Sequence, residues 1–133
     1  MAAVAKSGTP SVCSQTPGRE HQINGLYAGE AIAAGDACYV KAADGKVWLS
    51  NGTAVNAAAK VRGFAATAAA AGEAVTLYAG VNFYYGTALS PGADLFASSV
   101  TSGALSDVAT VGGTAPIGYV VDATRVHLDR SRY

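Results

Sequence analysis

Short runs in which apolar and polar residues alternate dominate the chain from residue 26 onward. The clearest is "DACYVKAADGKVWLS" at 36–50, which has the dipeptide Asp44-Gly45 at its centre. The more apolar positions of this run are Cys38, Val40, Val47 and Leu49. A period of two indicates half-buried strands, and Asp-Gly favours a tight turn between them. The run therefore predicts a β-hairpin.

Six further runs have the same character and are separated by Gly, Ser or Asp. They lie at 60–65, 73–78, 81–86, 93–98, 117–121 and 124–128. Many short strands joined by turns are typical of an all-β sandwich or barrel. No long helical pattern alternates with them, which excludes a parallel α/β sheet. We therefore expect a compact β-sandwich or small, β-tulip-like barrel.

The alanine-rich stretch "FAATAAAAGEA" at 64–74 contains strong helix formers but sits between predicted strands. It aligns with "AIAAGDACYV" from Ala31 and "ALSPGADLFA" from Ala88, each with a glycine at the fifth position of the aligned block. These glycines are Gly35, Gly72 and Gly92. A glycine that adopts positive φ can form the turn before a strand. The stretch is thus predicted to be one of three turns that begin strands.

Residues 1–25 contain two of the four prolines and no apolar periodicity. This composition predicts an extended N-terminal arm, followed by one β domain at 26–133. An ordinary loose terminus is the alternative.

Composition narrows the classes of function. Charged residues make up 14% of the chain, well below the usual quarter or so, and nine basic residues balance nine acidic ones. We therefore expect no nucleic-acid partner, and a surface that packs against another protein. Because no secretory signal or membrane-length apolar stretch is present, we expect a protein made in the cytoplasm with reduced cysteines and no membrane partner.

Few residues suggest chemistry. A nucleophilic pair of Cys13 or Cys38 with His127 is conceivable, but neither cysteine lies in a catalytic motif, and His21 lies in the predicted arm. The three carboxylates near the turns, Glu30, Asp36 and Glu73, are best explained by local turn hydrogen bonds. No spacing suits a metal or a phosphate loop. We expect no catalytic, cofactor-binding or metal-binding residues, and hence no enzyme.

The aromatic run "NFYYG" contains Phe83, Tyr84 and Tyr85. Exposed rings of this kind could bind a glycan or a single nucleic-acid strand. However, neighbouring strand residues point to opposite faces, so only Phe83 and Tyr85 share one face. We expect one face in the core and the other in a contact between subunits.

The order of these motifs resembles the small capsid decoration (cement) proteins of tailed bacteriophages. The resemblance is carried by "AAGDACYVKAADGKV", "KVRGFAATAAAAGEAVTLYAGV", "GADLFASSVTSGALS" and "APIGYVVDATRVHL", and covers about residues 26–129. It implies a β-sandwich or barrel on the outer surface of the virion. The implied partners are the major capsid protein and two further copies in a homotrimer, with the arm along the shell as added β-structure.

Two alternatives remain at this point. One is a trimeric head-fibre or adhesion module that binds host glycans or receptors, in which "NFYYG" would be exposed. The other is a small hydrolase that uses Cys38 or Cys13. For the arm, we expect that deleting residues 1–25 leaves the β domain folded and weakens capsid binding.

Overall fold

The structure is a computed structural model that describes residues 3–12 and 21–131. The chain is almost entirely β, as the alternating runs predict. Its strands are β1 (Ala3–Val4), β2 (Ser11–Val12), β3 (Gln22–Tyr27), β4 (Ala37–Val40), β5 (Val47–Leu49), β6 (Gly63–Ala65), β7 (Ala74–Tyr78), β8 (Val81–Tyr84), β9 (Asp94–Ala97), β10 (Leu105–Ser106), β11 (Gly118–Val120) and β12 (Arg125–Leu128). The 3₁₀ turn η2 (Ala57–Ala59) lies between β5 and β6.

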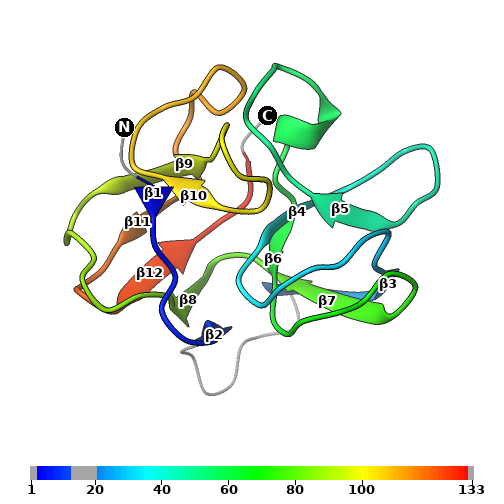
Figure 1. Cartoon of the computed structure of the whole chain (residues 1–133), viewed down its shortest axis with the longest axis horizontal. Coiled ribbons are helices and arrows are strands. Elements are labelled where there is room, and N and C mark those ends of the chain that lie inside the picture. The colour runs from blue at the N-terminus through cyan, green and yellow to red at the C-terminus, as the bar shows by residue number, and fades with distance from the viewer. Residues whose placement is uncertain (1–2, 13–20, 132–133) are drawn as a thin grey trace.

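The strands form two antiparallel sheets that pack as a sandwich (Figure 1). The larger sheet has seven strands in the order β1-β10-β9-β11-β12-β8-β2, and the smaller has five in the order β3-β7-β6-β4-β5. Every strand predicted from residue 36 onward is present, and the hairpin at 36–50 is formed by β4 and β5. The expected fold class is therefore confirmed.

The five-stranded sheet curls until its two edges meet. Ala28, which follows β3, pairs in parallel with Val47 of β5. The amide of Gly29 donates to the carbonyl of Val47 at 2.8 Å. This contact joins the first and last strands of the sheet, so the sheet encloses a small core of its own.

Two hydrophobic clusters result from this arrangement. The larger lies between the sheets and combines Phe64 of β6 with Phe83 of β8 and Leu95 of β9, all fully buried. The smaller lies inside the curled sheet and includes Cys38, Val47 and Leu77. The alternation seen in the sequence therefore corresponds to burial, although Val40, near the end of its strand, is 39% exposed.

The three predicted glycine turns are real, and the structure contains a fourth. Gly35, Gly72, Gly92 and Gly103 have φ values of 82°, 87°, 84° and 81°. In each, the residue after the glycine donates its amide to the carbonyl three residues earlier, at 3.0 to 3.2 Å. Positive φ at the third position of a four-residue turn is the type II arrangement. A strand begins within two residues of every one of these glycines.

The amide of each turn glycine also bonds to a segment outside its own turn. Gly35 donates to Ala65, Gly72 to Ala28, Gly92 to Val120 and Gly103 to Ser50, at 2.7 to 2.8 Å. These bonds tie the turns to other parts of the sandwich. The alanine run at 68–71 is thus the approach to a cross-linked turn, as its alignment predicts.

The N-terminal region differs from the predicted arm in its boundary and in its pairing with the β domain. The predicted boundary after residue 25 falls inside β3, which runs from Gln22 to Tyr27 and pairs with β7. Asn24 and Gly25 lie in a register shift of that pairing, where Gly25 has φ 78°. A bulge at this point interrupts the alternation by which a strand is recognised in sequence.

Residues 3–12 run extended along the seven-stranded sheet, from one edge to the other (Figure 1). Ala3 and Val4 pair with β10, and Ser11 and Val12 pair with β8. Between these strands the amide of Ser7 donates to the carbonyl of Tyr85 at 2.9 Å. We call residues 3–12 the N-terminal strap.

Candidate functional site

Cys38 is a packed thiol in the core of the curled sheet. It is fully buried, and its Sγ donates to the carbonyl of Asp36 at 3.3 Å. Burial, together with the nearby Asp36 carboxylate, raises the pKa of the thiol far above its usual range, so the neutral form is strongly favoured. His127 lies in the other sheet, where its Nδ1 is 2.7 Å from Asn82 Oδ1. The two residues therefore have separate partners; Cys13 lies outside the described residues.

The three candidate carboxylates have structural partners, although only two match the predicted turn bonds. Glu73 accepts from the amide of Ala70 at 2.7 Å, and Asp36 accepts from Ala33 at 2.9 Å. Glu30 differs, because its Oε2 accepts from the amide of Leu49 at 3.0 Å, across the seam that closes the curled sheet. The turn interpretation is wrong for Glu30, which satisfies an amide of β5.

The "NFYYG" run does not form an exposed aromatic platform. Phe83 and Tyr85 face the core and are almost fully buried, whereas Tyr84 between them is about half exposed. The prediction that Phe83 and Tyr85 share a core face is confirmed. The adhesion hypothesis thereby loses the observation that motivated it, since Tyr85 cannot contact an external glycan.

The N-terminal strap is held in place by a partly buried ion pair. The ammonium of Lys6 bonds to the carboxylate of Asp36, with their side chains 26% and 12% exposed. Pro10 of the strap is buried, and it lies where a side chain on Gly35 would project. The sequence contained no signal for this pairing, because the partners are far apart in the chain and lie in different predicted regions.

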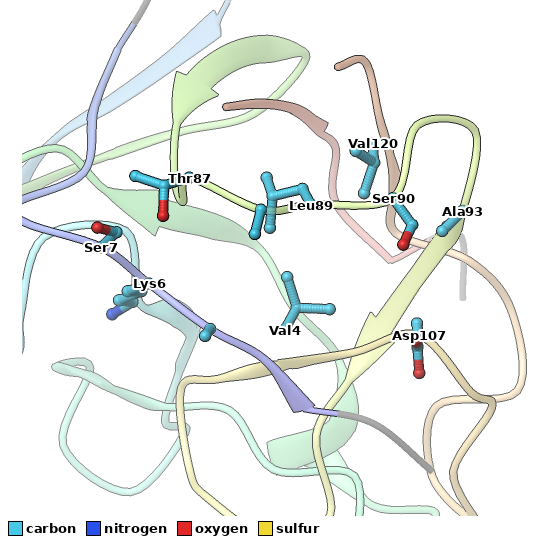
Figure 2. Close-up of a pocket in the computed structure, with 11 residues that line it drawn as sticks. Val4, Lys6, Ser7, Thr87, Leu89, Ser90, Ala93, Asp107 and Val120 are labelled. Atoms are coloured by element: carbon cyan, nitrogen blue, oxygen red, sulfur yellow. The ribbon is translucent and has the colours of Figure 1, made fainter. Parts of the chain in front are cut away.

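A hollow of about 390 Å³ lies beside the strap, and Figure 2 shows the residues that line it. Val4 on the strap faces Leu89 on the β8–β9 connection, and Val120 of β11 also lines the hollow. Serine and threonine hydroxyls and the carboxylate of Asp107 line the rest of the wall, while the ammonium of Lys6 is committed to Asp36. The hollow therefore combines apolar side chains with polar groups and one acidic group.

A second hollow, of about 350 Å³, lies on the seven-stranded sheet and is lined by Asp94, Tyr119, His127 and Asp129, among others. We call it the acidic hollow. Tyr119 stands directly opposite Asp94 on one neighbouring strand and His127 on the other. Its ring is 48% exposed and lies 5.4 Å from the imidazole. A row of polar and aromatic side chains thus crosses the outer face of the sheet.

A third hollow, of about 700 Å³, adjoins the curled sheet and is lined by His21, Ile23, Val40, Arg62 and Arg130, among others. We call it the basic groove. Ile23 and Val40 are 41% and 39% exposed, so the groove combines apolar surface with guanidinium groups. Asp129 lines both this groove and the acidic hollow. These surfaces are built from several strands, which explains why no sequence motif identified them.

Outside these hollows, two exposed carboxylates have pKa values below the usual range, Asp44 in the β4–β5 hairpin and Asp122. Asp122 accepts hydrogen bonds from the side chain of Arg125 and from the amides of Thr124 and Arg125. These bonds, led by that from the guanidinium, hold the pKa of Asp122 well below its usual range. The arrangement stabilises the turn between β11 and β12.

Among residues 3–12 and 21–131, no three His, Cys, Asp or Glu side chains gather as a metal site would require. None of the helical segments within those ranges is long and apolar enough to cross a membrane. Comparisons with protein-family models, with curated proteins and with solved structures find no match to this chain.

Proposed function

We propose that the chain is a structural protein of a tailed-phage head, which binds the outside of the capsid and stabilises it by bridging major capsid protein subunits. It would act as a homotrimer on the virion surface, without cofactor, metal or enzymatic activity. Many copies, each contributing modest binding energy, would stabilise a shell through multivalency.

One observation carries this proposal. The residues responsible for the resemblance to decoration proteins are the same residues that build the sandwich. Gly35, Gly72 and Gly92, which mark the resembling segments, each form a type II turn that precedes a strand. The resemblance thus concerns the framework of the fold and is not limited to composition.

Three of the side chains that first suggested chemistry give further support, because they have structural tasks. Cys38 packs in a core, Glu30 closes the curled sheet, and Asp36 holds the N-terminal strap. A weakly charged sandwich with exposed tyrosines and grooves is suited to broad contact with other proteins.

If the N-terminal segment adds a strand to a capsid subunit, it must first leave its place in its own chain. Residues 3–12 already pair with β10 and β8 of their own chain. Strand addition to a capsid subunit would require these pairings to open first. Deleting residues 1–25 would remove β1, β2 and part of β3, so loss of binding after that deletion would not isolate a role of the arm.

The direct test is to mix the purified protein with undecorated mature capsids. We expect the protein to sediment with the shells and to raise the temperature at which they disrupt, relative to shells alone. If it neither binds nor shifts that temperature, the proposed function is wrong.

A further inference from the structure

The acidic hollow and the basic groove lie next to each other and carry opposite charge. Asp94 and Asp129 contribute carboxylates to the hollow, whereas Arg62 and Arg130 contribute guanidinium groups to the groove. Within residues 3–12 and 21–131, neither Asp94 nor either arginine forms an ion pair. The charges are therefore available to another molecule.

The acidic hollow has the chemistry of a receptor for a guanidinium group. Nδ1 of His127 lies 2.7 Å from Oδ1 of Asn82, and this contact fixes the imidazole on the wall of the hollow. The two carboxylates can accept from the donors of an arginine. The half-exposed ring of Tyr119 offers a surface on which a planar guanidinium can stack.

The basic groove has the complementary properties. Arg62 and Arg130 lie beside Ile23 and Val40, whose exposed apolar surface would be removed from water by a close partner. A partner that offers carboxylates next to an aromatic ring fits both features. The acidic hollow of the same protein supplies both of these groups.

We propose that the basic groove of one copy docks on the acidic hollow of a second copy. The two surfaces share Asp129, so they adjoin on each molecule. In a closed ring of head-to-tail contacts, the two contact surfaces of each subunit meet near the symmetry axis. Asp129 would then lie close to that axis, with Arg62 and Arg130 of one copy directed at Asp94 and Tyr119 of the next.

This inference deepens the proposed function, since it names the surface by which neighbouring copies on a shell would contact each other. Its test uses the free protein without capsids. A protein that does not self-associate could still bind capsids, and a protein that does not bind capsids could still self-associate. The two tests therefore distinguish failure of this inference from failure of the proposed function.

The experiment measures association by sedimentation velocity over a wide range of protein concentration. We expect reversible association of the wild-type chain that weakens as salt is added. Asp94→Arg and Arg62→Asp should each raise the dissociation constant more than about tenfold, because each places like charges together. The double variant should associate nearly as well as the wild type. Lys46→Asp, a charge reversal on the exposed hairpin, serves as the control and should change little.

A mixture of Asp94→Arg with Arg62→Asp gives a sharper test of the same contact. In Asp94→Arg both surfaces carry positive charge, and in Arg62→Asp both carry negative charge, so copies of the same variant repel each other. The hollow of either variant is, however, opposite in charge to the groove of the other. The mixture should therefore associate through contacts between unlike chains, whereas each variant alone should not. Circular dichroism verifies folding, and if Arg62→Asp fails to fold, the exposed Arg130→Asp replaces it.

Three results would overturn the proposal. The first is a wild-type chain that stays monomeric at every concentration. The second is association that the single reversals leave unchanged. The third is loss of association in the single variants that neither the double variant nor the mixture restores.

Discussion

The seating of the N-terminal strap can be tested with two alanine substitutions in turns of the same type. Gly35 and Gly72 both occupy the third position of a type II turn, with φ of 82° and 87°. A Cβ on Gly72 would have no neighbouring atom within 4 Å, whereas one on Gly35 would lie 2.8 Å from Cβ of Pro10. The two sites thus share the backbone strain and differ in the contact with the strap.

The expected losses of stability follow from the backbone strain at both glycines and from the clash with Pro10 at Gly35 alone. Holding an alanine at positive φ costs about 1–2 kcal/mol, which we expect for Gly72→Ala. Gly35→Ala should lose the same amount plus about 1–3 kcal/mol, because the added methyl group would displace a buried proline. Its free energy of unfolding should therefore fall by about 2–5 kcal/mol in total.

Urea denaturation at constant temperature provides the measurement, provided that both variants keep the wild-type m-value. A double-mutant cycle then isolates the clash, because Pro10→Gly removes the atoms that the new methyl group would meet. In that background the extra loss at Gly35 should disappear. If Gly35→Ala and Gly72→Ala lose the same stability, Pro10 is not seated against this turn and the reasoning is refuted.

Three other predictions concern the ion pair, the core and a surface carboxylate. Lys6→Met should lower the free energy of unfolding by about 2 kcal/mol, because it leaves Asp36 partly buried without its cation, and a Lys6→Met/Asp36→Asn double variant should recover much of this in urea titrations. Phe83→Ala should lower the free energy of unfolding by about 3–5 kcal/mol, and Tyr84→Ala should lower it far less, because Tyr84 is exposed. Equal losses would contradict the alternation of buried and exposed residues along β8. Asp122 has a lowered pKa in the folded state, so its stabilising effect is present above the ordinary aspartate range and is lost as the pH falls through the lowered value. The Tm difference between wild type and Asp122→Asn should accordingly shrink on acidification from about pH 4 downward, and a difference that is constant with pH would be inconsistent with this.

The sequence predicted the framework of the fold because turns and alternation are local properties. Asp44-Gly45 marked a hairpin, and the glycines at 35, 72 and 92 marked turns, since positive φ favours one residue type. The fourth turn at Gly103 carries the same signal, a glycine two residues before a strand, and could have been found with it.

What the sequence did not predict depends on contacts between distant segments. β1 and β2 have two residues each and therefore no period, and the bulge in β3 breaks its alternation. The bonds of Lys6 to Asp36 and of Glu30 to Leu49 join residues that only the folded topology brings together. The hollows likewise collect side chains from several strands and connections.

The path of the N-terminal strap also has a consequence for the order in which the protein is made. Ala3 pairs with Ser106, and Val12 pairs with Phe83, so the strap is synthesised well before the segments with which it pairs. Until β8 and β10 are synthesised, the strap has no strand to pair with. After that, one edge of β10 and one edge of β8 remain unpaired until the strap binds to them. Where many copies are synthesised together, this interval allows the strap of one chain to reach the sheet of another. Dilution during refolding should therefore favour chains that close on their own strap.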